Sequence, residues 1–412
     1  MKNVFRPADI LIPQNVDMTA WSVVACDQFT SEPEYWKEVE NTVGDKPSTL
    51  RLMLPEAYLG TVNSEEATKK INATMQKYLD EGIFKEYKNS YISVERTLKN
   101  GSVRRGVIGA LDLEYYDYSQ NSSSPIRATE GTVEDRLPPR VKVRKDAPLE
   151  MPHIMVFIDD PADTVMYMAE GYETLYDFDL MQGGGHVKGT LVPDTIMVDA
   201  ALDALSDPKV MGFKYDLKTR APVVFAMGDG NHSLATAKKC WEAIKPTLTA
   251  DQQENHPARF ALVELVNIHD ESISFEPIHK VVFETKTDDF IAAAKEYFAG
   301  RQGEGHEIKL IAAGREETLK ISGYTIGELI GSCETFCQQY MSANGGKIDY
   351  IHGDEEAADM AAAPNTAAIL LPKMEKSELF PSVIKSGPFP KKSFSIGLGP
   401  DKRYYLECRK IK

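Results

Sequence analysis

One five-residue segment, Asp229-Gly230-Asn231-His232-Ser233, concentrates the side chains best able to do chemistry. The apolar run 222–226 before it predicts a buried strand, because β-branched and aromatic residues cluster there without charge. Residues 234–241 predict a helix that Asn231 or Ser233 would cap. A strand that feeds a helix N-terminus through a tight turn offers free N–H groups and a positive dipole end, which suits a phosphate. The alternative is a turn and a helix cap alone.

The phosphate interpretation gives each of these residues a role. The backbone of Gly230, Asn231 and Ser233 would bind phosphate or nucleotide oxygens, and His232 would act as a further donor in catalysis. Asp229 would be a second catalytic residue and a metal ligand, orienting Mg²⁺ or an attacking hydroxyl. The segment lacks the Gly-Lys-Ser/Thr ending of a P-loop and the third glycine of a dinucleotide fingerprint.

A second segment, residues 126–136, alternates two arginines, two hydroxyls and three carboxylates around one glycine. Arginine forks match phosphate oxygens, and a neighbouring carboxylate can serve as a base or hold a metal. We expect Glu130 to be the general base and Asp135 a further metal ligand. The expected phosphate-binding residues are Arg127, Thr129, Thr132 and Arg136. The alternative is a solvated charged loop.

Two histidines are predicted substrate contacts. His186 follows the three glycines 183–185, which let the backbone approach a ligand closely. His279 lies in the apolar run 277–282, where a structural histidine is the alternative. Near the C-terminus, the lysines 391–392 either line an anionic pocket or belong to an exposed basic tail.

The elements that must position these residues alternate between helix and strand patterns. Residues 117–152 predict a long loop, and 166–168 with 173–178 predict a hairpin. The pattern changes near residue 285, where helices and strands become short and regular. The sequence therefore predicts a mixed α/β fold, with a catalytic or binding region over 1–285 and a smaller α/β region over 286–412.

Composition narrows the class of protein. The 412 residues are 42% hydrophobic and 26% charged, which is typical of a globular protein. The net charge of −15 argues against a nucleic-acid partner, which would need a basic face. No apolar run reaches the length of a membrane span, and the first residues lack a signal-peptide pattern, so we expect a cytoplasmic protein. The five scattered cysteines are expected to be buried free thiols, and the oligomeric state is left open.

The order of these motifs resembles a bacterial family catalogued as domain of unknown function 1015. The resemblance rests on the segments 6–7, 127–136, 185–186, 229–232 and 277–280, and continues more loosely to residue 381. That family's loop, Ala-Asp-Gly-His-His-Arg, is similar to the loop of the ParB/sulfiredoxin superfamily, which includes a free serine kinase. The resemblance implies a ParB/sulfiredoxin-like core with a mixed sheet.

In that superfamily the loop and its helix hold nucleotide phosphates. The match carries this role to Asp229, Gly230 and His232, whereas Asn231 and Ser233 replace the family's histidine and arginine. Residues and resemblance together predict a phosphotransferase or phosphatase that acts on a small metabolite, with free serine or phosphoserine as the substrate. Mg²⁺ and ATP or ADP are the expected cofactors. The alternative is a noncatalytic sensor of a nucleotide or a phosphorylated metabolite.

Overall fold

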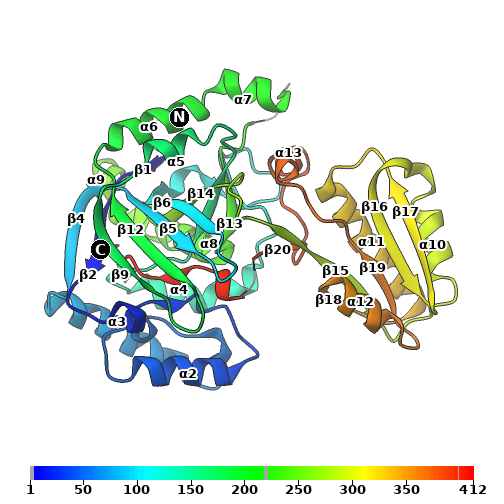
Figure 1. The fold of residues 1–412 in the computed structure, drawn as a ribbon, viewed down its shortest axis with the longest axis horizontal. Coiled ribbons are helices and arrows are strands. Elements are labelled where there is room, and N and C mark those ends of the chain that lie inside the picture. The colour runs from blue at the N-terminus through cyan, green and yellow to red at the C-terminus, as the bar shows by residue number, and fades with distance from the viewer. Residues whose placement is uncertain (1–3, 218–220, 398) are drawn as a thin grey trace.

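The computed structural model describes residues 4–217, 221–397 and 399–412, which form a large and a small lobe (Figure 1). A mixed sheet runs through the large lobe, and β1 (Phe5–Arg6) also pairs with its strand β6. The strand order is β11 (Glu173–Asp179), β12 (His186–Leu191), β5 (Ile92–Thr97), β6 (Val103–Asp112), β14 (Phe260–Asn267), β10 (Met155–Ile158), β13 (Phe225–Asp229), β8 (Ile126–Arg127) and β7 (Tyr116–Asp117).

The centre of this sheet explains why β13 ends where it does. Every residue of β10 and β14 is buried, and the two strands pair in parallel, as expected for continuous apolar runs covered on both faces. β13 pairs antiparallel with β10, which sets Asp229 opposite Met155. The turn after Asp229 therefore lies at the end of an inner strand of the sheet. The predicted mixed α/β fold is confirmed.

Helices cover both faces of the large sheet. α5, α6 and α8 pack on one face against β10 and β14, whereas α2 and α3 belong to the apolar cluster on the other face. The helices of this lobe are α1 (Met18–Trp21), α2 (Pro33–Val43), α3 (Ser64–Asp80), α4 (Leu137–Lys145), α5 (Thr164–Met168), α6 (Thr195–Leu205), α7 (Pro208–Tyr215), α8 (Asn231–Ile244) and α9 (Ala250–Asn255).

The small lobe has its own sheet, and its main apolar cluster continues into the large lobe, where it includes Met155, Phe157 and Val266. Its strands, in order, are β17 (Arg315–Ile321), β16 (Gln302–Ala312), β19 (Ala367–Leu370), β15 (Phe275–Phe283) and β18 (Lys347–His352). The apolar side chains of α10 (Phe290–Tyr297), α11 (Ile326–Asn344) and α13 (Leu379–Ser386) pack on one face, and α12 (Asp354–Ala361) covers the other.

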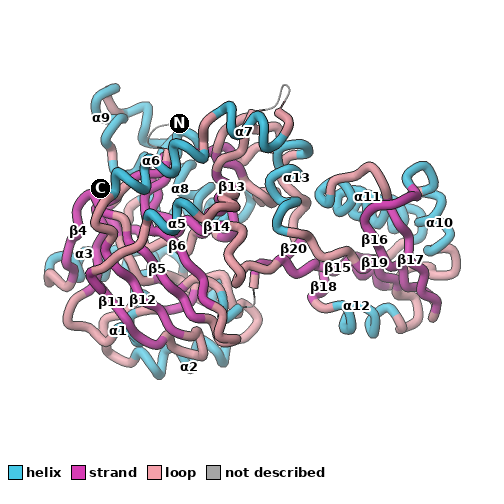
Figure 2. The backbone as a smooth tube through the Cα atoms, turned by 45° about the horizontal axis from the view of Figure 1, so that its top comes forward, coloured by secondary structure: helices cyan, strands magenta, loops and turns pink. Residues whose placement is uncertain are grey.

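Two strands run side by side between the lobes in both views. β20 (Phe394–Ile396) pairs with the start of β15, and the chain then re-enters the large lobe (Figures 1 and 2). There β21 (Tyr404–Tyr405) pairs with β3 (Val23–Val24), and β22 (Arg409–Lys410) pairs with β9 (Leu149–Glu150). A further pair joins β2 (Ala8–Pro13) to β4 (Phe84–Ser90).

This return of the chain differs from the predicted division into 1–285 and 286–412. β15 precedes residue 285 yet belongs to the small sheet, and the last strands pair with strands of the large lobe. Strand pairs that join residues hundreds of positions apart leave no local periodicity, so the sequence pattern does not reveal them.

Two shorter predictions are corrected by the structure. Residues 166–168 lie in helix α5 rather than in a strand, and β11 forms its hairpin with β12 instead. The predicted loop 117–152 contains α4, which packs against α8. Two prolines at the start of α4 fit its first turn, where no intrahelical N–H partner is lost.

Candidate active site

The N-terminus of α8 opens without a side-chain cap. Gly230 is the N-cap residue and has a left-handed φ of 76°. In the described structure no side chain at the N-cap position bonds to the first N–H groups of the helix. A Cβ on Gly230 would lie 2.9 Å from the Cα of Ile154, so glycine is required by both conformation and space. The N–H groups of residues 231–233 therefore form an anion-binding geometry of the kind that the sequence predicts.

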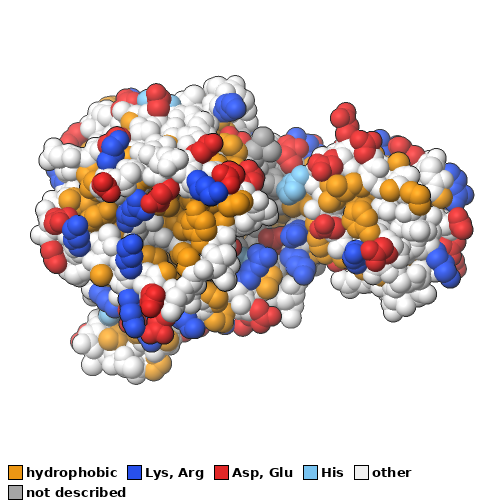
Figure 3. Space-filling view, turned by 90° about the horizontal axis from the view of Figure 1, so that it is seen from below, with side chains coloured by type: hydrophobic (Ala, Val, Ile, Leu, Met, Phe, Trp, Pro, Cys, Tyr) orange, Lys and Arg blue, Asp and Glu red, His pale blue; other side chains and the backbone are white. Residues whose placement is uncertain are grey.

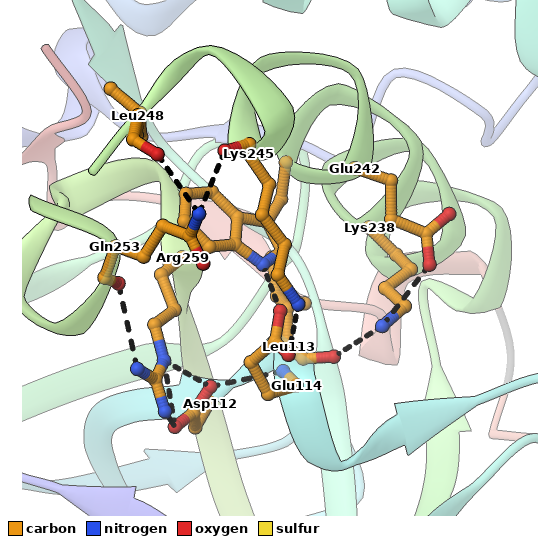
Figure 4. A network of polar contacts seen from close by, with 10 residues as sticks. Asp112, Leu113, Glu114, Lys238, Glu242, Lys245, Leu248, Gln253 and Arg259 are labelled. Atoms are coloured by element: carbon orange, nitrogen blue, oxygen red, sulfur yellow. Dashed lines mark hydrogen bonds and ion pairs between the residues drawn. The ribbon is translucent and has the colours of Figure 1, made fainter. Parts of the chain in front are cut away.

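A polar network fixes the far end of α8 to the sheet (Figure 4). Lys238 Nζ donates to the carbonyl of Leu113 at 2.9 Å, and Glu114 accepts hydrogen bonds from Trp241 Nε1 and from Lys245 Nζ. The residues just before β14 join the network through the ion pair of Arg259 and Asp112, and Gln253 donates to carbonyls after α8. These contacts anchor the C-terminal part of α8 to the segment that follows β6.

A polar cavity of about 310 Å³ lies at this N-terminus. Both lobes and the connecting strand β20 contribute to its walls. Four side chains are cationic and four are carboxylates, namely Arg136, Arg140, Lys392, Lys402, Asp27, Glu56, Glu130 and Asp229. In the space-filling view, Lys, Arg and His side chains gather near the junction of the lobes (Figure 3).

Asp229 is held by a lysine from the end of the chain. Lys402 Nζ lies 3.1 Å from Asp229 Oδ2, and the two side chains are only 13% and 20% exposed. The other carboxylate oxygen accepts from the N–H of Gly230 at 2.8 Å. The return of the C-terminal segment thus brings a cation directly beside the predicted catalytic carboxylate.

Glu130 is a largely buried carboxyl group of the cavity. Burial raises its pKa, and Asp229 adds to the shift, whereas hydrogen bonds from the backbone N–H groups of Lys392 and Ser393 oppose it. The loop that carries Glu130 also pairs with the small lobe, since Gly131 N donates to Phe389 O at 2.9 Å. Glu130 therefore lies where the two lobes meet.

Asn231 and His232 build the cavity wall with their side chains. Asn231 Nδ2 donates to Glu130 O and to Thr132 Oγ1, each at 3.0 Å, and Asn231 Oδ1 accepts from Tyr116. His232 Nε2 accepts from the N–H of Val133 at 3.2 Å. Burial, with Arg140 and Arg136 nearby, lowers the pKa of His232 to about 4, so this histidine is neutral at pH 7.

A buried histidine that sequence reasoning missed lies at the centre of the cavity wall. His153 Nε2 is 3.4 Å from Ser233 Oγ and 3.7 Å from Asp27 Oδ2, while Nδ1 contacts Tyr405 Oη at 2.9 Å. Burial favours the neutral forms of His153 and Asp27. Their mutual attraction prevails, raising the pKa of His153 and lowering that of Asp27.

The structure brings together most of the predicted site residues. Asp229, Gly230, Asn231, His232, Ser233, Thr129, Glu130 and Arg136 line the cavity. Thr129 Oγ1 donates to Met227 O at 2.6 Å, and Thr132 is held behind the wall by Asn231. The two segments 126–136 and 229–233, on which the predicted chemistry depends, therefore meet in space.

Arg127 and Asp135, two further predicted residues of the segment 126–136, lie outside the cavity lining in the described structure. Arg127 donates to the carbonyls of Ser124 and Ala221, so its guanidinium holds β8 rather than a ligand. Asp135 is exposed on the short turn that precedes α4. For Arg127, residue type alone does not determine which way the side chain points, because a strand alternates its side chains between two faces.

Both predicted substrate histidines are also outside the cavity lining. His186 is half-buried on the β11–β12 hairpin, where it contacts the carboxylates of Asp177 and Asp179 at 2.6 and 2.7 Å. His279 is buried in β15, accepts from Leu371 N at 3.0 Å and contacts Asp354. His279 thus has the structural role that the sequence left open.

Several cavity residues carried too weak a signal to be singled out. Asp27 and His153 belong to no recognisable motif, and Lys402 lies in the short charged run 401–403. The pairing of β3 with β21 brings Asp27 and Lys402 near the same cavity. The lysine pair 391–392 was the one usable signal, since Lys392 lines the cavity.

The described residues contain neither a metal-binding cluster nor a membrane-spanning helix. No group of three or more His, Cys, Asp or Glu side chains in residues 4–217, 221–397 and 399–412 is arranged to hold a metal ion. Among the helices of the same residues, none has the length and apolarity of a membrane span.

Comparison with known proteins identifies the family. By its fold and site, the chain is a mixed α/β protein with a polar cavity at an uncapped helix N-terminus. The chain belongs to the family described as Protein of unknown function (DUF1015), whose model matches residues 6–373. The predicted family membership is thus confirmed. No curated protein matches the chain.

Solved structures show only distant likeness. SbnI with a C-terminal truncation, from Staphylococcus aureus, is 9% identical, with a TM-score of 0.37, and 71% of this chain and 82% of that chain are covered. A free serine kinase in complex with AMP is 11% identical, with a TM-score of 0.36 and coverage of 73% and 91%. A conserved hypothetical protein from Pyrococcus furiosus is 10% identical, with a TM-score of 0.35 and coverage of 73% and 94%. Such distant likenesses assign neither ligand nor reaction to this chain.

Proposed function

We propose that the protein transfers or removes a phosphoryl group on a small metabolite. The observation that carries this proposal is the uncapped N-terminus of α8, which opens into a cavity lined by four cationic side chains. Phosphoryl transfer requires positioned positive charge more than covalent chemistry from the protein. Three N–H groups, the helix dipole and the cations supply that charge in one place.

Glu130 is the general base of this proposal. A substrate hydroxyl attacks phosphorus, its proton passes to Glu130, and the bond from phosphorus to the leaving oxygen breaks. The raised pKa of Glu130 supports this role because a base works best when its pKa is near the working pH. Asp229, fixed by Lys402, orients the hydroxyl, and Arg136 and Arg140 stabilise charge on the phosphoryl oxygens.

Free serine or phosphoserine is the proposed metabolite. An amino acid carries one ammonium and one carboxylate, and the cavity offers carboxylates and cations side by side. ATP or ADP is the proposed phosphoryl donor or acceptor. A Mg²⁺ ion would be held by Asp229 together with phosphate oxygens, since Mg²⁺ commonly binds through one or two carboxylates plus substrate phosphates.

A phosphorus NMR time course with Mg²⁺ tests this function. One sample contains ATP or ADP with L-serine, and another contains phosphoserine alone and then with AMP or ADP. We expect new phosphorus signals with the wild-type protein and at least about a 100-fold slower reaction with Glu130→Gln. The matched control is Glu134→Gln, which changes an exposed glutamate outside the cavity lining. Equal rates for wild type and Glu130→Gln would remove Glu130 from the mechanism.

A noncatalytic sensor of a nucleotide or a phosphorylated metabolite is the second candidate. The observation that favours it is that Asn231 and His232 use their side chains to build the wall. A sensor predicts line broadening of one phosphorus compound with no new signal in the same experiment.

A further inference from the structure

A second cavity, of about 300 Å³, adjoins the polar one. Its walls come from α3, from α4 and from the segments before and after them. Its apolar lining includes Leu52, Leu54 and Val143, and charged side chains such as Lys142, Arg144 and Glu150 lie at its walls as well. Three methionines, Met53, Met75 and Met151, also face this space.

The two cavities share one wall. Cys26, Glu56, Arg140, His153 and Ser233 line both of them. Ser233 is in the first turn of α8, so a phosphate bound to that turn lies directly at the shared wall. Arg140, which is ion-paired with Glu56, presents its charge beside the polar cavity and its stem beside the apolar one.

We propose that the second cavity holds the flat aromatic body of the ligand whose phosphoryl group is bound at α8. The ligand is then a phosphate ester with an aromatic body, such as a nucleoside phosphate or an aryl phosphate. This inference rests on the proposed function, because it needs the phosphate site at α8.

The chemistry of the lining favours an aromatic body over a purely aliphatic chain. Methionine thioethers make favourable contacts with aromatic rings and adapt to their shape. The hydroxyls of Ser64, Thr68 and Thr236 line the same space. Those of Thr68 and Thr236 donate to the carbonyls of Ser64 and His232, and each still accepts from a polar ring edge, which an alkyl chain does not offer. A concave space that combines apolar side chains with placed polar groups is the usual form of a small-molecule site.

Isothermal titration with four phosphate compounds tests the inference. The probes are inorganic phosphate, O-phosphoserine, 1-naphthyl phosphate and AMP, each titrated into the full chain. Because the aromatic body leaves water, we expect 1-naphthyl phosphate or AMP to bind at least about tenfold more tightly than inorganic phosphate. A preference for AMP alone points to a nucleoside, and equal binding of both aromatic compounds points to aryl esters in general.

Two variants that fill the cavity from facing walls sharpen this test. Thr68→Trp acts from α3 and Val143→Trp from α4, and each is expected to reduce the affinity ratio to about one. The matched control is Val62→Trp, at an exposed position near Thr68 that lies outside the lining. It is expected to keep the ratio.

The outcomes separate the two proposals. Equal affinity of all four compounds for the wild type, or an unchanged ratio in both filled variants, overturns the aromatic cavity and leaves the phosphate site standing. Absence of binding by every compound overturns the proposed function and this inference together.

Discussion

The pair of Lys402 and Asp229 gives the sharpest energetic prediction. Lys402→Met removes the ammonium group that lies 3.1 Å from Asp229 Oδ2, while the aliphatic stem is approximately retained. Exposed ion pairs are worth about 0–1 kcal/mol, and breaking a fully buried pair costs about 3–5 kcal/mol. With side chains 13% and 20% exposed, this pair lies between those limits. We expect Lys402→Met to lower the free energy of unfolding by about 2 kcal/mol.

A double-mutant cycle isolates the pair from other effects of the substitution. Asp229→Asn removes the partner charge with little change of shape, so the double variant no longer leaves one charge unpaired. We expect a coupling energy of about 1–2 kcal/mol, measured by urea unfolding. Lys412→Met is the control, since its ion pair with Asp146 is 4.0 Å long and exposed. Additive effects of the two substitutions would refute the assignment of Lys402 as the residue that holds Asp229.

Three further substitutions test the wall of the cavity and the support of α8. Asn231→Ala removes three hydrogen bonds and is expected to lower the free energy of unfolding by about 2–3 kcal/mol, measured with urea. The control Asn255→Ala, at an exposed position, is expected to change it by less than about 0.5 kcal/mol. Equal changes in the two variants would contradict the role of Asn231 in the cavity wall. His232 has a folded pKa of about 4, below its ordinary value of 6.5, so the unfolded chain binds more protons between these values and stability falls as pH falls from 6.5 to 4. His232→Gln, which keeps an acceptor for Val133, is expected to remove about 2 kcal/mol of that loss, and an unchanged pH profile of urea midpoints would count against a neutral His232. Glu114→Ala leaves Trp241 and Lys245 without their acceptor and is expected to lower the free energy of unfolding by about 2 kcal/mol, measured by thermal unfolding. The control Glu254→Ala, at an exposed position, is expected to change it little. Similar melting points of the two variants would refute the anchoring of α8.

Local patterns predict the part of the site that is contiguous in sequence. The strand, the turn at Gly230 and the helix after it follow from apolar runs and turn chemistry, although β13 runs from Phe225 to Asp229 rather than over the predicted 222–226. The predicted chemistry required Glu130 to meet this turn, but the sequence could not show it, because the meeting depends on the pairing of β8 with β13.

The rest depends on contacts between distant parts of the chain. Lys402 reaches Asp229 because the C-terminal segment returns to the large sheet, where the neighbouring Arg403 pairs with Glu264 of β14, and His153 reaches Ser233 because β10 pairs with β13. Arg127 illustrates the opposite case, since its residue type suits phosphate but its position in β8 directs it to backbone carbonyls. Residue type thus indicates the chemistry available, whereas strand pairing determines which side chains share a cavity.

The most direct test of the central claim observes the N–H groups at the start of α8. The sequence contains one Gly-Asn and one His-Ser peptide bond, at residues 230–231 and 232–233. Labelling with ¹³C′-glycine and ¹⁵N-asparagine therefore isolates the Asn231 amide signal, and ¹³C′-histidine with ¹⁵N-serine isolates that of Ser233. Titration with inorganic phosphate is predicted to shift both amide signals saturably, with one common Kd. Amide signals that stay unchanged up to high phosphate concentration would contradict an anion site at α8.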